Sequence, residues 1–501
     1  MNTKLLKQKI LDLAIRGKLT QQLKSDGTAK DLLTQISDER RETKDERKGT
    51  RSKKSGVILS EAQSAKSKDL GQIIPLDKSE APFEIPANWE WVRLPDVCSI
   101  PITDGTHQTP TYSNKEEGIP FLSAKDVTTQ KIVWDKIKYI TKSLHEELCL
   151  RIAPQRNDIL LAKNGTTGVA ALVETDIVFD IYVTLAVLRP RKIINPKFLL
   201  YFVNGPVAKA QFDASLKGVG VPNLHLSEIN KVILPLPPLA EQQRIVEKIQ
   251  EAFVEIDSIE NNKELLKTHI KQTRQKILDL AIHGKLVPQN KTDEPASVLL
   301  ERITRDNPHY EKLTDIPFEI PDSWAWVKLG TVCKVFGRIG FRGYTKKDLV
   351  EKGMGAISLS PSNMDGMKLF FDNCTYISWD KYYESPEIML DEGDVVVVKT
   401  GSSYGKTALV NKLPEKTTLN PQLMVLKQID CNHDYLNFFL NTAYFRKHFE
   451  DLVNGTAIPT FSQEKFSCKL IPLPPLAEQK RIVDRIEEIF KSLDEISLHL
   501  V

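Results

Sequence analysis

The sequence lacks most of the features that mark secreted, membrane-spanning or metal-binding proteins. Its cysteines form no Cys-x-x-Cys pair and show no zinc-ligand spacing, which is typical of a reduced, intracellular protein. The N-terminus resembles the first helix of a water-soluble protein rather than a signal peptide, and no apolar run approaches the roughly 18 residues of a membrane span. We therefore expect a cytoplasmic protein with no membrane partner. The cysteines are Cys98, Cys149, Cys333, Cys374, Cys431 and Cys468.

Neither sign of charge is in excess, because 69 Lys and Arg residues are balanced by 66 Asp and Glu residues, which leaves a formal net charge of +3. Nucleic-acid binding requires a basic face rather than a basic total, so this balance neither demands nor excludes it. The length of 501 residues is sufficient for several hydrophobic cores, and more than one domain is expected.

Signatures of common enzyme classes are also missing from the sequence. A methyltransferase would pair a Gly-rich cofactor loop with an Asn/Asp-Pro-Pro-aromatic motif, and the nearest segment, residues 420–423, lacks the second proline and the aromatic residue. No His-Glu-x-x-His motif, serine elbow or nuclease-like carboxylate cluster occurs. The chain is therefore expected to be non-catalytic by itself, with no metal-ligating residues.

What the sequence does contain is a long internal repeat. The string PLPPLAEQ occurs at residues 235–242 and again at residues 472–479, and each copy opens a heptad-patterned helix. The string PFEIP, followed by two tryptophans, occurs at residues 82–86 and 317–321. One module is therefore present twice. Two similar modules on a stiff spacer suit a linear target with two parts, of which double-stranded DNA is the commonest.

The distance between the repeated strings reveals an insertion in the first copy. Residues 9–15 recur at residues 276–282, an offset of 267, whereas the PFEIP strings are offset by 235. The first copy thus carries roughly 32 additional residues (267 − 235), located around residues 38–72. This stretch mixes both charge signs with almost no apolar residues, so we expect a solvated, disordered loop.

The heptad pattern predicts one long helix over residues 240–283, ending before Gly284. A second copy starts at Ala477, but the chain stops at Val501 after half of that helix, and residues 3–16 correspond to the missing half. We therefore predict a circularly permuted repeat whose termini meet. The expected seam positions are Ile249, Ile256, Ile270 and Ile277 at a, and Ile245, Ala252, Ile259, Leu266 and Leu280 at d.

An apolar seam of this length needs a partner, and the second copy in the same chain is the simplest one. An antiparallel pair of such helices would form a rod of roughly 66 Å at about 1.5 Å per residue. The alternative is that these helices pack on their neighbouring domains as ordinary amphipathic helices. The split helix argues against that alternative, because it leaves the matching halves at opposite ends of the chain unexplained.

Each globular module is expected to mix strands and helices. Buried strands are predicted at residues 158–162, 181–188, 394–398 and 422–426. Residues 196–216 and 433–453 are each predicted to form a helix whose aromatic residues belong to the core rather than to a base-stacking surface. The tryptophans of the PFEIP elements, Trp89, Trp91, Trp324 and Trp326, are likewise assigned to packing.

A Gly-rich loop follows a predicted strand in each module. The second loop, residues 399–407, resembles a phosphate-binding P-loop but has three rather than four residues before its final Gly-Lys-Thr, so nucleotide hydrolysis is not expected. Glycines and small hydroxyl residues suit contact with a phosphodiester backbone, although a structural turn without a ligand stays open. The candidate residues are Lys163, Asn164, Thr166, Thr167, Lys399, Ser402, Ser403, Tyr404 and Lys406.

Two further loops, at residues 104–110 and 337–347, differ between the modules and are the expected place for specificity. Arg can form paired hydrogen bonds with guanine, and Gln with adenine, in the major groove of DNA. Similar frames that carry dissimilar loops are what two readers of different half-sites would need. The candidate base-contacting residues are Thr106, His107, Gln108, Arg338, Arg342 and Tyr344.

The pattern resembles the specificity (S) subunit of Type I restriction-modification enzymes over essentially the whole chain. The resemblance is carried by residues 235–246 and 472–483 and by the string shared by residues 9–15 and 276–282. It implies two target recognition domains, each reading half of a bipartite DNA site, and helices that set the spacer and dock two modification subunits. Restriction subunits would complete the complex. S-adenosylmethionine, ATP and Mg²⁺ would be bound by these partner subunits, and no cofactor by this chain.

The expected fold is therefore α+β, with two pseudo-symmetric recognition domains separated by a long antiparallel two-helix coiled coil, in a circularly permuted repeat with adjacent termini. Two other functions stay open on the residues alone: a coiled-coil scaffold with two protein- or glycan-binding domains, and a self-contained DNA-modifying enzyme. The predicted regions are helical residues 1–37, the charged linker 38–81, recognition domains 82–235 and 317–472, the central helical region 236–316, and the C-terminal helix 473–501.

Overall fold

The computed structural model describes residues 2–51, 76, 78–216, 222–305, 313, 316–338, 343–452 and 460–500. The chain divides into two compact units, Met1–Asn262 and Lys263–Val501, which are described separately. The division falls within one helix, α8 (Leu239–Ile282), whose first part belongs to the first unit and whose second part belongs to the second. Among the described residues, no helix is both long enough and apolar enough to cross a membrane.

The first unit contains two four-stranded sheets. Their strands, in spatial order, are β2 (Thr103–Asp104), β9 (Leu185–Leu188), β6 (Ile159–Ala162) and β7 (Ala170–Leu172), then β3 (Tyr112–Ser113), β5 (Lys138–Ile140), β4 (Ile119–Leu122) and β8 (Asp180–Ile181). All neighbouring strands are antiparallel except β4 and β8, which run parallel. Every residue of β6 and β9 is buried, which accounts for their uninterrupted apolar sequence.

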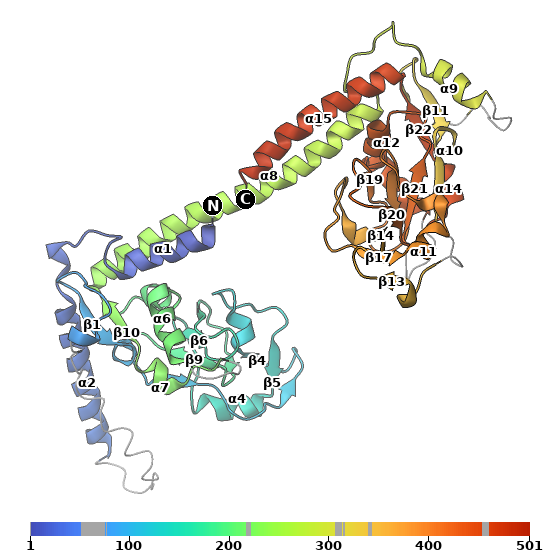
Figure 1. Cartoon of the computed structure of the whole chain (residues 1–501). Helices are drawn as coiled ribbons and strands as arrows, with labels where there is room; N and C mark the ends of the chain where they lie inside the picture. The colour runs from blue at the N-terminus through green and yellow to red at the C-terminus, as the bar shows by residue number, and fades with distance from the viewer. Residues whose placement is uncertain are drawn as a thin grey trace. The chain divides into compact units, whose positions relative to one another are not determined.

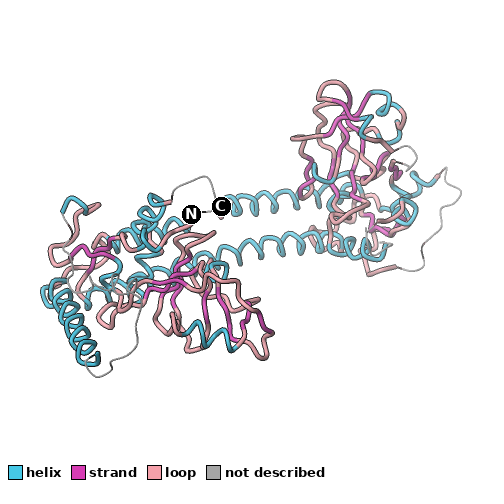
Figure 2. Tube along the Cα trace, turned by 90° about the horizontal axis from the view of Figure 1, so that it is seen from below, coloured by secondary structure: helices cyan, strands magenta, loops and turns pink. Residues whose placement is uncertain are grey.

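The second unit repeats this topology strand for strand. Figure 2 shows the strands of each unit in magenta. Its strands, in the same spatial order, are β12 (Lys334–Gly337), β21 (Leu423–Lys427), β18 (Val395–Val398) and β19 (Thr407–Leu409), then β13 (Leu349–Val350), β17 (Thr375–Ser378), β14 (Gly355–Leu359) and β20 (Thr417–Leu419). Here too the last pair, β14 and β20, is the parallel one. The second unit also contains a short hairpin of β15 (Met364–Asp365) and β16 (Lys368–Leu369). No equivalent hairpin occurs among the described residues of the first unit. The sequence repeat thus corresponds to a repeated fold.

A two-stranded ribbon closes each globular domain. In the first unit β1 (Glu90–Arg93) pairs with β10 (Ile233–Leu236), and in the second β11 (Ala325–Lys328) pairs with β22 (Leu470–Leu473). Trp91 lies opposite Pro235, and Trp326 lies opposite Pro472, so the two repeated strings of each domain are bonded to one another. The start and the end of each domain therefore meet directly before the long helix that follows.

The PLPPLAEQ string docks this helix on its domain. Glu241 is fully buried at the helix start, and its carboxylate accepts a hydrogen bond of 2.8 Å from the indole Nε1 of Trp89. The Gln242 side chain donates to the carbonyl of Pro237 at 3.0 Å and accepts from the main-chain N–H of Asn195 at 2.9 Å. Buried polar groups are stable only when they are paired, and each of these side chains is.

The second unit has the same joint. Glu478 accepts from the Trp324 indole at 3.0 Å, Gln479 donates to the carbonyl of Pro474 at 2.8 Å, and the N–H of Asn432 donates to Gln479 at 2.7 Å. Burial raises the pKa of the Glu478 carboxyl above its ordinary value, although the hydrogen bond from Trp324 opposes that shift. The repeated string is thus a structural element that fixes a helix to a domain.

Helix α1 (Thr3–Ile15) packs against the first part of α8 in the first unit (Figure 1). Leu11 is buried together with Ile245 and Ile249 in one hydrophobic cluster. Lys7 forms an ion pair with Asp257, and its ammonium lies 5.3 Å from the centre of the Phe253 ring. Since residue numbers rise along α1 as they fall along α8, the two helices are antiparallel.

Helix α15 (Leu476–Leu498) packs against the second part of α8 in the second unit in the same manner. Arg274 donates to Asp494 at 2.5 Å, and its guanidinium lies 4.6 Å from the centre of the Phe490 ring. Leu278 and Ile486 belong to the shared hydrophobic cluster. This pair is also antiparallel. The helix bounds predicted from sequence agree with α1, α8 and α15 to within a few residues.

The predicted heptad seam is not continuous along α8. Ile245, Ile249, Ile256 and Ile270 are buried, but Ile259 and Leu266 are 46% and 40% exposed. Towards the C-terminal end Leu278 and Ala281 are buried instead of the expected Ile277 and Leu280. A straight helix has 3.6 rather than 3.5 residues per turn, so its buried face drifts away from a strict heptad seam. The predicted meeting of the termini involves Met1 and Val501, which lie outside the described residues.

Two predicted helices and one predicted strand are each divided. Residues 196–216 form α5 (Pro196–Val203) and α6 (Pro206–Ser215), separated because Gly205 caps α6 and Pro206 occupies its first turn. Residues 433–453 form α12 (His433–Leu440) and α13 (Ala443–Leu452). The predicted strand at residues 181–188 is divided into β8 and β9 by a turn. The assignment of the aromatic residues to the core is confirmed, since Phe198, Phe202, Tyr435 and Phe439 are all at most 2% exposed.

The charged insertion is partly helical, contrary to the expectation of a loop. Helix α2 (Ala29–Arg51) includes the first part of the insertion, up to Arg51. Residues 52–75 lie outside the described residues. Arg40 donates to Asp96 at 3.0 Å, and Arg191 donates to Glu39 at 3.1 Å, so the insertion starts on the surface of the first domain. The other α-helices among the described residues are α4 (Lys142–Cys149), α7 (Leu226–Ile229), α9 (Ala296–Thr304), α10 (Leu329–Val332), α11 (Trp379–Tyr383) and α14 (Gln463–Ser467).

Candidate nucleic-acid interface

The register of the sheets shows which residues of the two domains are equivalent. Each central strand, β6 or β18, pairs with β9 or β21, which in turn pairs with β2 or β12. The corresponding rows are Leu161–Ala186–Asp104 in the first unit and Val397–Met424–Gly337 in the second. Asp104 and Gly337 therefore occupy the same place in the fold. Lys163 lies two residues after Leu161 of β6, and Lys399 lies two residues after Val397 of β18.

In the first domain, Lys163 is held in a buried ion pair. Its side chain is 8% exposed, and its ammonium donates to Oδ2 of Asp104, itself 3% exposed. Arg151 donates to Oδ1 of the same carboxylate at 2.6 Å, and Nε2 of His107 lies 3.3 Å from it. Burial alone would raise the pKa of Asp104, but the hydrogen bonds and charges of Lys163 and His107 outweigh burial and lower it. The position of Lys163 thus argues against the phosphate contact predicted for it.

In the second domain, the equivalent Lys399 has no such partner. Gly337 stands where Asp104 stands in the first domain, and a Cβ atom added there would lie 3.3 Å from Nζ of Lys399. Among the described residues no carboxylate is within ion-pair distance of Lys399, and burial lowers the pKa of its ammonium. A partly buried cation without a counter-ion is suited to receive an anion such as a phosphate.

The Gly-rich loops after β6 and β18 have similar backbone geometry. Gly165 and Gly401 have positive φ angles of 73° and 105°, which residues with a Cβ rarely adopt. Each loop is held by one bridge, between Asn164 and Asn223 in the first domain and between Thr400 and Thr460 in the second. These constraints place the following residues at a fixed, sharp turn on the surface.

The exposed tips of these loops are Thr166 and Ser402. Within the described part of the chain, their main-chain N–H groups donate to no protein acceptor, so both can donate to a ligand oxygen. The other predicted loop residues are partly buried. They are Asn164, Thr167, Ser403, Tyr404 and Lys406. Tyr404 packs against the core of the second domain, which gives its ring a structural role in addition to any ligand contact.

The variable loop of the first domain presents two of its three candidate residues. Thr106 is 8% exposed, and its hydroxyl accepts from the N–H of Gln108 at 3.2 Å, so it shapes the loop. The His107 side chain is 61% exposed, and Gln108 is exposed as well. His107 and Gln108 are therefore the two of the three candidates whose side chains are accessible to a ligand.

The variable loop of the second domain differs from expectation. Arg338 is only 2% exposed, and its guanidinium donates to the carbonyl of Leu419 at 3.1 Å and to the hydroxyl of Thr418 at 3.4 Å. Burial lowers the pKa of Arg338. Its side chain thus braces β20 and is not offered to a groove. Tyr344 is partly buried and accepts a hydrogen bond of 3.0 Å from Ser358. The third candidate, Arg342, lies outside the described residues.

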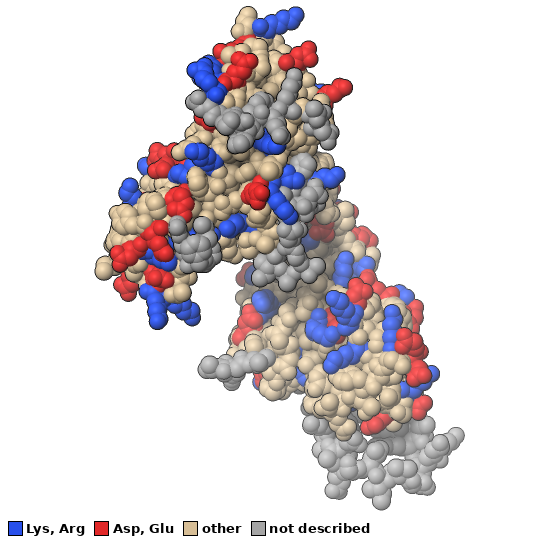
Figure 3. Space-filling view, turned by 90° about the vertical axis from the view of Figure 1, so that its right-hand side faces the viewer, with Lys and Arg blue, Asp and Glu red and all other residues tan. Residues whose placement is uncertain are grey.

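Charge is not gathered into one broad patch on the face drawn in Figure 3. Lys and Arg side chains are interspersed there with Asp and Glu side chains. On this face no wide basic surface is present, so the candidate anion contacts there are individual cations and main-chain donors. Sequence reasoning missed Asp104 and Arg151, which decide whether Lys163 is available, because Asp104 lies 59 residues from Lys163 along the chain.

Comparison with known proteins places both domains in one family. The model of the family described as Type I restriction modification DNA specificity domain matches the chain twice, over residues 86–268 and 321–499. Among curated proteins, the Type I restriction enzyme EcoAI specificity subunit of Escherichia coli is 25% identical, with 98% of this chain and 90% of that protein covered. The EcoEI specificity subunit of Escherichia coli is 23% identical, with coverages of 99% and 90%.

A solved structure has the same fold. That structure concerns complex assembly and conformational transition of the type I R-M system. It aligns with this chain with a TM-score of 0.54 and a sequence identity of 20%. The alignment covers 84% of this chain and 94% of that one. An identity this low supports similarity of fold alone, so the site residues must be argued from this chain.

Proposed function

The chain belongs to the Type I restriction modification DNA specificity family, and from this premise we propose that each of its two domains reads one half of a bipartite DNA site. It is the DNA-sequence-specificity subunit of a Type I restriction-modification system and not a catalytic subunit. The observation that carries the proposal is the repeated topology with dissimilar loops at the same place in each copy. One frame used twice can hold two different sets of base contacts.

Within each domain, phosphate contacts fix the position on DNA and loop side chains specify the sequence. In the second domain the ammonium of Lys399 and the N–H groups near Ser402 are the phosphate contacts. In the first domain the N–H groups near Thr166 take this part, and His107 and Gln108 approach base edges. Gln is suited to adenine, because its amide can both accept from N6 and donate to N7.

The long helix α8 serves as the spacer between the two half-sites. Three observations support this role: α8 is uninterrupted over 44 residues, α1 packs antiparallel on its first part, and α15 packs antiparallel on its second part. We propose that these pairs form one continuous antiparallel strut, that the chain is a circular permutant of a repeated unit, and that its ends meet on that strut. The helices would then fix the length of DNA between the two contacted halves.

The complex formed on this chain would contain two modification subunits, one for each repeat, together with restriction subunits. A twofold repeat presents the same docking surface twice, which favours two copies of one partner. In this proposal S-adenosylmethionine, ATP and Mg²⁺ are bound by the partner subunits, which methylate, translocate and cleave. This chain contributes the choice of DNA sequence and the geometry.

The proposal is tested by mapping methylated bases in a host that expresses the full system. The wild-type chain should yield one motif with two specific halves and a fixed, non-specific spacer. A chain whose residues 317–472 are replaced by a second copy of residues 82–235 should yield a motif whose two halves are identical and inverted. An unchanged motif, or loss of only one base from it, would contradict the assignment of one half-site to each domain.

A further inference from the structure

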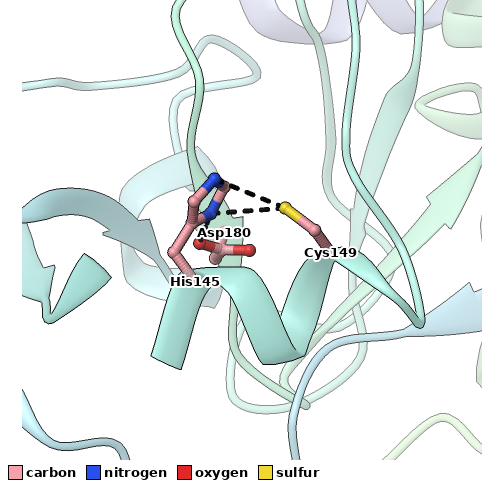
Figure 4. Close-up of side chains that lie close together, drawn as sticks. All are labelled: His145, Cys149 and Asp180. Carbon is pink, nitrogen blue, oxygen red and sulfur yellow. Dashed lines mark hydrogen bonds and ion pairs between the residues drawn. The ribbon is translucent and has the colours of Figure 1, made fainter. Parts of the chain in front are cut away.

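Three potential metal ligands lie together in the first unit. His145 and Cys149 are one helical turn apart on the same face of α4, and Asp180 begins β8 (Figure 4). Nδ1 of His145 is 2.6 Å from Oδ2 of Asp180, and Sγ of Cys149 is 3.4 Å from the imidazole nitrogens of His145. One ligand atom from each residue lies within 4.8 Å of the other two.

The carboxylate of Asp180 is incompletely paired. Its side chain is 1% exposed, and its Oδ1 atom has no hydrogen-bond partner. A buried carboxylate oxygen without a partner is costly, and native structures rarely leave one without a reason. A cation between the three side chains would pair with this carboxylate and account for its position.

We propose that His145, Cys149 and Asp180 form a binding site for a divalent transition metal of the zinc class. Imidazole nitrogen, thiolate sulfur and carboxylate oxygen are the ligands that zinc takes in proteins, with bonds of about 2.0 to 2.3 Å. Tetrahedral bonds of that length separate neighbouring ligand atoms by roughly 3.3 to 3.8 Å. The sulfur–nitrogen distance of 3.4 Å already fits this range, and the contact between His145 and Asp180 has to open by about 1 Å. A water molecule would complete the site.

A Cys-His-Asp group can also be a nucleophilic site, but this one is not arranged for that chemistry. Burial raises the pKa of the Cys149 thiol, and the negative charge of Asp180 raises it further. A catalytic cysteine needs the opposite environment, in which a cation or a helix N-terminus stabilises the thiolate. Cys149 is the last residue of α4, at the end of the helix that disfavours an anion.

The second unit provides an internal comparison. His145 is the fourth residue after the helix cap Thr141, and Tyr382 is the fourth residue after the equivalent cap Ser378. Asp180 pairs with β4 at the position where Thr418 pairs with β14. The second unit therefore has a phenol and a hydroxyl in place of the imidazole and the carboxylate. One metal ion per chain is expected, not two.

The site has a consequence for the variable loop of the first domain. Tyr182, two residues after Asp180, forms a bridge with Thr106 at the base of that loop. A metal that joins α4 to β8 would fix the strand on which the loop rests. The metal site rests on the geometry of three side chains and does not depend on the proposed half-site function.

The test uses the full chain without a histidine tag, treated with a chelator, dialysed against zinc chloride and freed of loosely bound metal. Elemental analysis should find one zinc per chain. Cys149→Ser and Asp180→Asn should each reduce bound zinc at least tenfold, whereas Cys468→Ser, which alters an exposed cysteine of the second unit, should retain it. Zinc content below one-tenth per wild-type chain, or equal zinc in Cys149→Ser and wild type, would overturn the proposal.

A second measurement does not depend on the folding of the variants. Cobalt added to the metal-free wild-type chain should give the near-ultraviolet absorption of a thiolate-to-cobalt charge transfer, and one equivalent should saturate it. The same titration of Cys468→Ser should be unchanged. A cobalt spectrum with no thiolate band in the wild-type chain would show that Cys149 is not a ligand and would overturn the site.

Discussion

The two domains have the same sheets in the same order, yet the lysine that follows the central strand has different neighbours in each. Lys163 is neutralised by Asp104, which also pairs with Arg151. Lys399 has a glycine at the corresponding place and, among the described residues, no carboxylate partner. A single position in a neighbouring strand thus changes a structural ion pair into a candidate phosphate contact.

This difference teaches that equivalent residues in a repeat need not have equivalent functions. The buried pair in the first domain fixes the start of the variable loop, because Asp104, Thr106 and His107 lie within four consecutive residues. The second domain gives up that anchor and gains an available ammonium group. We therefore expect the two domains to respond differently to matched substitutions.

Asp104→Ala should cause the largest loss of stability. It leaves Lys163 buried without a partner, which should lower the free energy of unfolding of the first unit by roughly 3 to 5 kcal/mol. Thermal denaturation of the purified chain measures this loss. The matched control is Asp176→Ala, which breaks an exposed 2.7 Å pair with Arg156 in the same unit and should cause a much smaller loss, because solvent screens an exposed pair. Equal losses would contradict the structural role of the buried pair.

Lys399→Ala should weaken binding to all DNA sequences alike. Loss of one phosphate contact should reduce the slope of log affinity against log salt concentration by about 0.9. Fluorescence anisotropy on duplexes at several salt concentrations measures the slope. Lys163→Ala is the comparison, and its slope should stay that of the wild type because that charge is already neutralised. An effect of Lys399→Ala limited to one base position would count against the phosphate role.

Gly337→Asp should give Lys399 a carboxylate partner, as Asp104 is the partner of Lys163 in the first domain. The new carboxylate would lie beside Nζ of Lys399, and the added Cβ would lie 2.6 Å from the amide nitrogen of Gln463, so that flexible side chain must shift and give up its hydrogen bond to the Gly337 carbonyl. DNA affinity should fall for all sequences, by no more than for Lys399→Ala. Gly337→Asn, of equal size and without charge, is the control and should bind more tightly than Gly337→Asp. The idea fails if the two variants bind alike.

DNA affinity should also depend on pH through Lys399. Burial lowers its pKa in the free protein, whereas a bound phosphate favours the charged form, so affinity should fall as pH rises through the lowered pKa. That pKa lies below the ordinary lysine value of 10.5. Lys399→Arg keeps its charge and should show a flatter profile from about pH 7 to about pH 9.5. Identical profiles for the two proteins would remove Lys399 from the interface.

The sequence alone predicted the repeat, the approximate bounds of α1, α8 and α15, and the buried strands β6, β18 and β21, because self-similarity and periodicity can be read directly from the residues. Its failures concern interactions over a distance. The burial of Lys163 depends on Asp104, 59 residues earlier, and the orientation of Arg338 depends on Leu419, 81 residues later. The proposed metal ligands escaped notice for the same reason, since Asp180 is 35 residues from His145.

Other differences have local causes that were present in the sequence. The break between α5 and α6 is marked by Gly205 and Pro206, a pair that starts a new helix, yet the aromatic spacing on either side favoured one helix. The charged insertion starts within α2, a helix that begins before it at Ala29. Composition indicated solvent exposure there and did not determine the backbone.

Phosphate-ethylation interference on the assembled complex and its DNA site tests the contrast between the domains most directly. The wild-type chain should show sensitive phosphates in both half-sites. Lys399→Ala should lose one of them, in the half bound by the second domain, and Lys163→Ala should lose none. Loss of a sensitive phosphate with Lys163→Ala, or an unchanged pattern with Lys399→Ala, would contradict the account.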